Sequence, residues 1–448
     1  MKRFTIIPLV VLSCLTPAIG SEAGAIFLLI SPGARAGGMG EANVAVADDA
    51  YASYWNPAGL GFLEGSELAM MHVNWLPNLA DDLYYDFFAF RRHVPNLGTL
   101  GGHLIYLSLG EQIRMGEGPE DYLGTFTSFM MATTVSYSSL LSEYSSFGIN
   151  AKISYQHLVD LGAGAEKGKG TSLDFGFDLG YLRKEFLTQN LDIGLTITNI
   201  GPKVAFIDPA QADPQPTNLT LGVNYRVIDS EFNKLSLIYD VNKLLVASYP
   251  DMDWNGDGII GGCDDDGHCT NIPRNGDYNK DGDQEKAHTD PVYFAIFTSW
   301  VDDWLLGGDT DFTGNGEIGG FDLNGFQTDS ILFGEQGYGK YGCEGQSDEN
   351  AVNQCDANNL VLEVGTGDDR TINNELEKLV HNFGMEYWYS KYFALRAGYY
   401  LDQSGKISNP TFGVGLRFSG YGFDFGYTSG EPGHPLTNTM RFSLNWEF

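Results

Sequence analysis

The chain has 448 residues and a formal net charge of −32 at pH 7, which argues against nucleic-acid binding because contact with phosphate needs Lys and Arg. Glycine is abundant, at 57 residues, and aromatic residues make up 13% of the chain, whereas charged residues make up only 19%. This composition favours β-structure over helix.

Residues 1–20 have the pattern of a cleaved secretory signal peptide. Residues 2–3 are basic, residues 6–15 form an apolar core, and residues 18–20 form a small-residue cleavage site. A lipoprotein signal ending at Cys14 is the alternative, although it would shorten the apolar core. After the signal there is no run of about 20 apolar residues, so helical membrane spans are excluded. The sequence therefore predicts a periplasmic, secreted or outer-membrane protein.

Most of the remaining chain consists of segments of about ten residues in which apolar and polar residues alternate. Residues 146–155 and 172–181 are clear examples. A period of two places the apolar side chains on one face of a strand, which is the core of a soluble sandwich or the lipid face of a membrane barrel. Gly, Asn, Ser and Thr stand opposite the apolar positions, and the segment length matches a tilted membrane span. We therefore predict an all-β fold, a transmembrane antiparallel barrel.

We expect about fourteen strands, an even number that is usual for bacterial barrels. They begin near residues 66, 85, 98, 127, 146, 170, 191, 217, 233, 378, 391, 410, 421 and 439. The barrel thus occupies residues 63–246 and 378–448. If both chain ends are periplasmic, the long polar loops at residues 110–124 and 159–170 and the acidic insertion at residues 247–377 all face outside. The last strand ends at Phe448, which resembles the signal read by the outer-membrane insertion machinery.

The insertion contains repeats with the spacing of calcium loops. Oxygen-bearing side chains stand at positions 1, 3, 5 and 12 of two copies, with Gly at position 6 for the sharp turn, and Asp at 12 resembles the dockerin version. A third copy has His288 at position 12 and should bind more weakly. A solvated acidic loop is the alternative to structural calcium. The expected ligands are Asp253, Asn255, Asp257 and Asp264; Asp311, Thr313, Asn315 and Asp322; and Asp277, Asn279, Asp281 and Asp283.

Four cysteines follow the signal, and all lie in the insertion, outside the predicted strands. An even number of cysteines in an oxidising compartment predicts two disulfides. The expected pairs are Cys263 with Cys269 and Cys343 with Cys355. Free or metal-binding thiols are the alternative.

Two stretches of sequence resemble a known family. The first is a glycine cluster with Gly37, Gly38 and Gly40 that leads to residues 54–60, Tyr-Trp-Asn-Pro-Ala-Gly-Leu, and the second is residues 382–389, Asn-Phe-Gly-Met-Glu-Tyr-Trp-Tyr, followed by residues 396–399, Arg-Ala-Gly-Tyr. Together they resemble the PorV/PorQ family, which is related to FadL-type outer-membrane channels, and the second stretch resembles PorV. The resemblance covers nearly all of residues 25–245 and 376–448.

The resemblance implies that residues 21–62 form an N-terminal plug inside a fourteen-stranded barrel. Its glycines would let the backbone fold tightly within a lumen. Asn56-Pro57 would form a turn that places Trp55 against the wall.

The same resemblance implies an outer-membrane component of a type IX secretion pathway. Its partners would be outer-membrane lipid, the C-terminal domains of secreted cargo, the translocon and a surface sortase. A FadL-like channel for hydrophobic small molecules, with residues 25–62 as a hatch, is the main alternative. A calcium-stabilised surface adhesin is a third. We do not expect an enzyme, because the eight His are scattered and no nucleophile motif or phosphate loop occurs.

Overall fold

The structure is a computed structural model. It describes residues 23–80, 82–115, 122–159, 169–206, 212–249, 252–253, 288–302, 309–310, 354–355, 361–362, 372–430 and 437–448. The predicted signal peptide lies outside these residues. The chain divides into two compact units, the first comprising Met1–Glu22, Ser248–Thr289 and Val301–Ile372, and the second comprising Ala23–Ala247, Asp290–Trp300 and Asn373–Phe448.

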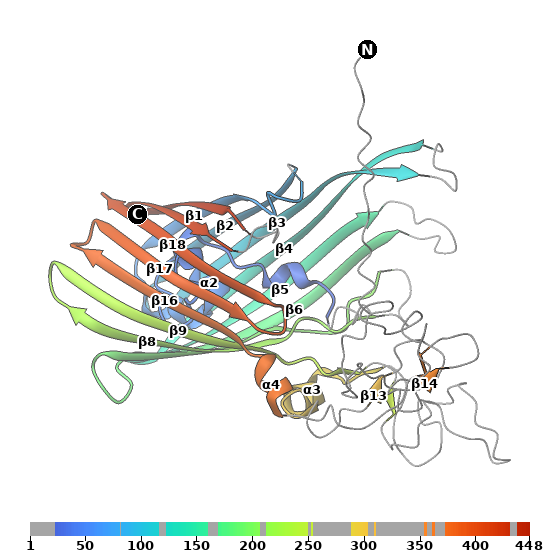
Figure 1. The fold of residues 1–448 in the computed structure, drawn as a ribbon. Coiled ribbons are helices and arrows are strands. Elements are labelled where there is room, and N and C mark those ends of the chain that lie inside the picture. The colour runs from blue at the N-terminus through green and yellow to red at the C-terminus, as the bar shows by residue number, and fades with distance from the viewer. Residues whose placement is uncertain are drawn as a thin grey trace. The chain divides into compact units, whose positions relative to one another are not determined.

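The second unit contains a closed antiparallel barrel of 14 strands (Figure 1), which confirms the predicted fold. In order around the barrel the strands are β1 (Ser66–Asn74), β2 (Leu83–Val94), β3 (Gly98–Met115), β4 (Tyr122–Ser142), β5 (Ser145–Val159), β6 (Gly170–Arg183), β7 (Leu191–Ile200), β8 (Asn218–Asp229), β9 (Asn233–Leu244), β16 (Val380–Tyr389), β17 (Phe393–Asp402), β18 (Ile407–Phe418), β19 (Tyr421–Thr428) and β20 (Thr439–Glu447). The first and last strands close the barrel, with Leu68 opposite Trp446 and His72 opposite Phe442.

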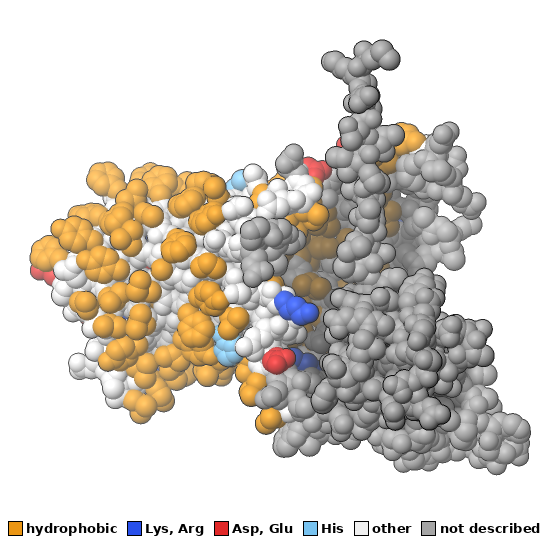
Figure 2. Space-filling model, in the orientation of Figure 1, with side chains coloured by type: hydrophobic (Ala, Val, Ile, Leu, Met, Phe, Trp, Pro, Cys, Tyr) orange, Lys and Arg blue, Asp and Glu red, His pale blue; other side chains and the backbone are white. Residues whose placement is uncertain are grey.

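The strands turn their apolar side chains outward, the reverse of a soluble protein. In β6, Leu173, Phe175 and Phe177 are exposed, whereas the intervening Asp174 and Asp178 are buried. Figure 2 shows the result as a broad hydrophobic face over the barrel wall. A hydrocarbon environment accounts for this arrangement, because an outward apolar band and a polar interior characterise membrane barrels.

Aromatic rings gather at both edges of this apolar band. Near one edge Tyr84, Tyr106 and Phe129 form a row across β2, β3 and β4, with ring centroids 6.0 and 5.8 Å apart. Near the other edge the rings of Tyr421 and Trp446 are stacked, with centroids 6.1 Å apart. Amphipathic aromatic rings favour the boundary between lipid and water, so the two rows mark the limits of the span.

The two ends of the barrel differ. At one end, which we call the short-turn end, brief connections join β2 to β3, β4 to β5, β6 to β7, β8 to β9, β16 to β17 and β18 to β19. There Ser66 N donates a hydrogen bond of 3.0 Å to Phe448 O. The connections from β3 to β4, β5 to β6, β7 to β8 and β9 to β16 lie at the opposite, long-loop end. The expected loop at residues 110–124 is wrong in extent, because β3 continues to Met115 and β4 already begins at Tyr122.

Residues 23–62 run through the barrel from the long-loop end to the short-turn end. Gly24 N donates to Pro214 O in the connection from β7 to β8, and Leu63 O accepts a hydrogen bond from Thr99 Oγ1 near the start of β3. This segment contains η1 (Ile26–Leu29), α1 (Ala34–Gly37), α2 (Ala52–Trp55) and η2 (Pro57–Phe62). We call it the plug.

The core of the molecule is the contact between the plug and the wall of β2 and β3. Buried Phe27, Tyr51 and Trp55 of the plug belong to one apolar cluster with Phe87 and Ile105 of the wall. The rings of Tyr51 and Phe87 stack with centroids 5.1 Å apart. A second, smaller apolar cluster joins Met39 and Ala42 of the plug to Ile238 of β9, so the plug has apolar contacts with the wall in two places.

The remaining described elements are short. The second unit also holds α3 (Val292–Thr298) and most of α4 (Ile372–Glu377). The described residues of the first unit form three two-stranded sheets, which pair β10 (Ser248–Tyr249) with β12 (His288–Thr289), β11 (Met252–Asp253) with β13 (Asp309–Thr310), and β14 (Gln354–Cys355) with β15 (Val361–Leu362). Among the described residues, no helix has the length and apolar character needed to cross a membrane.

Candidate functional site

The glycine cluster lies where the plug touches the wall backbone. A Cβ atom on Gly38 would stand 2.8 Å from Gly413 Cα, and one on Gly40 would stand 2.5 Å from Phe383 O. Gly40 also has a φ of +64°, in the left-handed region that favours glycine. A larger residue at either position would push the plug off β16 and β18.

Polar side chains of the wall satisfy the plug backbone at the same place. Gly40 N donates to Thr411 Oγ1 at 2.7 Å, and Asn382 Nδ2 donates to Gly40 O at 2.6 Å. A little further along, Asn43 N and Val44 N both donate to Asp240 Oδ2, at 2.7 and 2.8 Å. These bonds meet the need of buried backbone groups for partners, and they define the position of the plug against β9, β16 and β18.

The Trp-Asn-Pro motif fixes the other side of the plug. Asn56 Nδ2 donates to Val44 O at 3.0 Å and to Tyr181 O of β6 at 3.1 Å, while Asn56 Oδ1 accepts from Ala58 N at 3.1 Å. Asn56 therefore caps η2, whose first residue is Pro57. Trp55 packs in the apolar cluster shared with the wall, but its indole N–H donates to Pro32 O within the plug itself.

A chain of alternating charges joins the plug to four strands. Arg35 Nε and Nη2 donate to Glu386 Oε1 and Oε2 of β16, each at 2.9 Å. Arg396 of β17 donates to the same carboxylate at 2.8 Å and to Asp424 of β19 at 2.7 Å. Arg417 Nη2 completes the chain, at 2.9 Å from Asp424 Oδ2. Each carboxylate thus lies between two guanidinium groups, which offsets the cost of burying the charges.

The charge state of the plug follows from this setting. Burial opposes the charge of Arg35, but the adjacent carboxylates of Asp48 and Glu386 outweigh burial and hold the pKa of Arg35 well above its usual value. Asp49 differs, because burial and the nearby Glu67 carboxylate raise its pKa to about 7, although Arg35 lies 3.7 Å away. Arg35 is therefore a permanent cation, whereas Asp49 gains its charge near neutral pH.

The short-turn end of the barrel opens into a cavity of about 930 Å³ below the plug. Arg35, Asp48 and Asp49 of the plug face wall residues of both signs across it. Among these wall residues, Glu67 and Arg91 form a buried ion pair of 2.7 Å. Because the charges alternate, the cavity presents no extended surface of a single sign.

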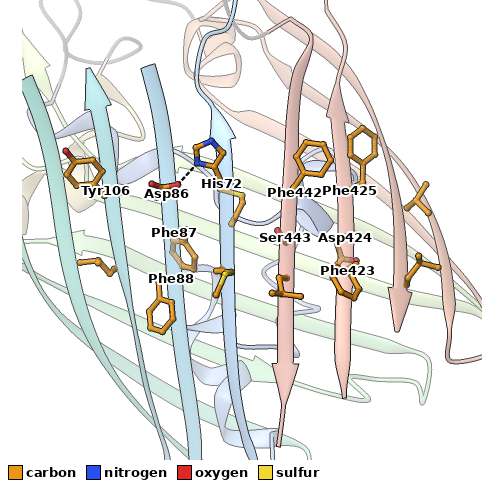
Figure 3. Close-up of a pocket in the computed structure, with 16 residues that line it drawn as sticks. His72, Asp86, Phe87, Phe88, Tyr106, Phe423, Asp424, Phe425, Phe442 and Ser443 are labelled. Atoms are coloured by element: carbon orange, nitrogen blue, oxygen red, sulfur yellow. Dashed lines mark hydrogen bonds and ion pairs between the residues drawn. The ribbon is translucent and has the colours of Figure 1, made fainter. Parts of the chain in front are cut away.

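The outer wall carries an apolar groove of about 630 Å³ across the seam where β1 meets β20 (Figure 3). Phe88, Phe423 and Phe442 stand along it, and His72 pairs with Asp86 toward its upper edge in the view, with Nδ1 and Oδ1 2.6 Å apart. The groove opens on the lipid-facing side of the wall. Met70 and His72 are therefore residues of the barrel wall, exposed on its outer face.

The predicted calcium and disulfide residues fall almost entirely outside the described residues. Asp253 lies in β11 and Cys355 in β14. The other eleven expected ligands, together with Cys263, Cys269 and Cys343, are not described. In the described part of the chain, no group of three or more His, Cys, Asp and Glu residues is placed to hold a metal ion. Calcium binding and both disulfides stay predictions.

Sequence reasoning missed the lumen residues that hold the plug in place. Asp240 and Asp424 stand at inward positions of otherwise alternating strands, so their orientation could be predicted. A charged residue at an inward position is the available signal, but it does not identify the partner.

The closed barrel, the outward apolar band with aromatic edges and the internal plug define an outer-membrane β-barrel protein. The family described as "Type IX secretion system protein PorV" matches residues 19–251, more than half of the chain, and the chain belongs to this family. The resemblance found in the sequence is thereby confirmed. This family is one of secretion components and not of enzymes.

Solved structures that resemble this chain include two toluene transporters and a FadL homologue. The Ralstonia pickettii toluene transporter TbuX is 13% identical, with a TM-score of 0.45 over 94% of this chain and 100% of that chain. The Pseudomonas putida toluene transporter TodX is 13% identical, with a TM-score of 0.45 over 93% and 96%. A Pseudomonas aeruginosa FadL homologue is 8% identical, with a TM-score of 0.38 over 93% and 98%. No curated protein matches the sequence.

Proposed function

We propose that this barrel receives secreted proteins in a type IX pathway and presents them at the cell surface, without moving solutes through its lumen. Membership of the PorV family supports the pathway. The way the plug is held supports the closed lumen. The plug bonds to β9 through Asp240, to β16 through Glu386 and to β20 through Ser443 Oγ, which accepts from Ala34 N at 2.8 Å.

Opening such a lumen would require the plug to leave partners on several sides at once. Separating Arg35 from Glu386 alone would strand buried charge, at a cost of about 3–5 kcal/mol. On the β4–β5 side, Ser146 Oγ donates to Ala58 O at 2.7 Å, so the plug is fastened on this side as well. A plug fastened around its circumference suits a docking component better than a gate that opens for each solute.

In this proposal the partners are the cargo C-terminal domain, the translocon and the surface sortase, and they meet the long-loop end. The insertion at residues 247–377 is attached to strand ends of that side, because it connects β9 to β16. Calcium and the two disulfides would order it, since a long polar loop has few apolar residues of its own.

Quantitative proteomics of a strain lacking the gene tests the proposal. Proteins with C-terminal sorting domains should accumulate in the periplasm and disappear from the surface, and the gene supplied in trans should reverse both changes. An unchanged distribution of these proteins would refute the secretion role.

A channel for hydrophobic molecules is the second candidate, and the groove in Figure 3 favours it. Most residues that line the groove are apolar, and they include inward Met71 and Phe87 as well as outward residues, so the groove reaches into the thickness of the wall. Under this reading the deletion strain would lose uptake of a radiolabelled aromatic hydrocarbon and secrete normally. The two candidates therefore predict opposite results in one strain.

A further inference from the structure

Helix α3 is amphipathic in the opposite sense to a helix on a water-soluble protein. Its buried residue is Ala295, and Ser299 directly after it is buried too. Tyr293, Phe294 and Phe297 are 64%, 56% and 74% exposed. A helix beside water buries its apolar stripe and exposes its polar one. This helix buries small side chains and presents aromatic rings outward, so its surroundings are at least partly apolar.

Helix α4 shows the same inversion. Glu375 is buried, whereas Leu376, the next residue, is 54% exposed. Carboxylates are rarely buried without a charged partner, and Glu375 has one, since Lys243 Nζ lies 3.1 Å from Glu375 Oε2. Two neighbouring helices with this inversion are unlike the isolated apolar residues that are common on protein surfaces.

Lys243 shows on which side of the wall the helices lie. Along β9, Tyr239 and Val241 are partly exposed on the outer face, while Asp240 points into the lumen toward the plug. Lys243 shares the outward parity of Tyr239 and Val241, yet it is only 3% exposed. The Lys243 ammonium lies against Glu375 of α4 and 5.9 Å from the ring of Trp300. Helices α3 and α4 therefore cover the outside of the wall, and Figure 1 shows them side by side near β9.

The height of the helices along the wall follows from the strand. Tyr239 Oη and His381 Nδ1 form a hydrogen bond of 2.7 Å on the outer face, and such aromatic groups stand where lipid tails give way to headgroups. Lys243 is four residues nearer to the long-loop end, which is about 13 Å along a strand that rises about 3.3 Å per residue. The helices therefore lie on the long-loop side of this boundary, on the side of the headgroups.

We propose that α3, Trp300 and α4, the rim helices, lie in the headgroup region of the membrane leaflet on the long-loop side. The exposed Tyr, Trp and Phe rings would enter the boundary between headgroups and acyl chains, which such rings favour. A helix of seven residues is too short to span the bilayer, so it rests on it. The charges of Lys243 and Glu375 are buried and paired with each other, whereas Glu377, at the end of α4, is exposed. This inference concerns the membrane surface and does not depend on the secretion role.

Depth-dependent quenching by brominated lipids tests the inference on the full chain in phosphatidylcholine vesicles. The signal of Trp300 is the difference in fluorescence between the wild type and Trp300→Phe. Bromine atoms on the acyl chain close to the headgroup should reduce this signal strongly, and bromine atoms near the bilayer centre should reduce it less. Matched controls are Trp446→Phe, at the opposite aromatic edge, which should report quenching, and Trp55→Phe, in the plug, which should not. Absence of lipid quenching at Trp300, with quenching at Trp446, would overturn the proposal.

A photo-crosslinking experiment in cells separates lipid from a protein partner. A benzoylphenylalanine introduced at Phe297 should give lipid adducts, as should one at Phe412, which is exposed in the middle of β18. A benzoylphenylalanine at Phe232, in the short turn between β8 and β9, is the matched control at the opposite end of the barrel. A single discrete protein adduct at Phe297, in place of lipid, would show that these aromatic rings are a protein-docking surface and would reject the membrane assignment.

Discussion

Arg35 of the plug and Glu386 of β16 are joined by two parallel hydrogen bonds of 2.9 Å although they stand 351 positions apart in the sequence. Both side chains are largely buried, and Glu386 also accepts from Arg396. The carboxylate is thus shared between a guanidinium of the plug and one of the wall. Whatever displaces the plug must break this shared site.

Replacing Glu386→Gln should loosen the plug. The neutral amide leaves both Arg35 and Arg396 without their shared counter-charge in a buried site, with an expected loss of about 3–5 kcal/mol. Limited proteolysis of the barrel in detergent should cut residues 23–62 faster in the variant, and planar bilayers should record larger ion conductance. The control is Asp229→Asn, which removes an exposed ion pair of 3.7 Å with Lys234 and should cost below about 1 kcal/mol. Equal protease resistance in both variants would contradict a fastening role for Glu386.

Replacing Gly40→Ala should displace the plug for a steric reason. The new methyl group would stand 2.5 Å from Phe383 O, and the φ of +64° adds backbone strain of about 1 kcal/mol. Gly65→Ala is a matched control, because Gly65 has a φ of +71° but its nearest atom would be 3.5 Å away. Urea unfolding in detergent micelles should therefore show a clearly larger loss for Gly40→Ala. Similar losses in the two variants would mean that backbone conformation, and not contact with the wall, is what Gly40 provides.

Stability should depend on pH through Asp49. Burial and Glu67 raise the pKa of Asp49 to about 7, so the folded protein holds a proton that the unfolded chain releases at lower pH. The stabilising contribution of this proton is complete below the unfolded pKa, near 4, and is lost as pH rises through 7. Asp49→Asn should remove this dependence and stabilise the barrel by about 4 kcal/mol at pH 8, with little change at pH 4. Unfolding curves of the wild type and the variant at pH 4 and pH 8 measure this change in stability. An equal change at both pH values would show that the pKa of Asp49 is not raised by folding.

Calcium should protect the insertion from proteases if its repeats are metal sites. Millimolar calcium is expected to slow trypsin cleavage within residues 250–370, and a chelator should reverse the effect, since extracellular calcium modules bind in this range. Asp264→Ala and Asp322→Ala remove position 12 of the two complete copies and should abolish most of the protection. Asp283→Ala, in the copy that has His288 at position 12, should change it little. If calcium still protects the insertion in Asp264→Ala and Asp322→Ala, the protection does not come from these repeats.

Alternation of apolar and polar residues was sufficient to predict the strands. The last five strands begin at Val380, Phe393, Ile407, Tyr421 and Thr439, each within three residues of the position expected from the sequence. The prediction works because lipid on one side and a polar lumen on the other impose a strict period of two. It failed for the connection after β3, where residues 111–114, three of them polar, continue as strand although they do not have the expected alternation.

The period of two does not show which residues meet inside the lumen. Asp240, Glu386 and Asp424 occupy inward positions of this period, although the sequence analysis did not single them out. The alternation in a strand does not show which residues the side chain meets across the lumen. Asn43 and Asp240 stand 197 positions apart, and Ala34 and Ser443 stand 409 apart. Such contacts depend on how the plug winds through a closed ring, and local sequence does not determine that path. The glycine cluster was found by family resemblance and not by its own pattern.

The closure between β1 and β20 has a consequence for assembly. The plug is made first and lies directly before β1, whereas Ser443, which holds Ala34, belongs to the strand made last. Until β16 to β20 have arrived, Arg35 lacks Glu386 and the backbone of Gly40 lacks Thr411, so the early segment has no stable place to settle. The contacts that hold the plug are therefore complete only when β20 has paired with β1, so the plug and the closed wall should become stable together. A chain that lacks β20 should have neither a closed barrel nor a fixed plug.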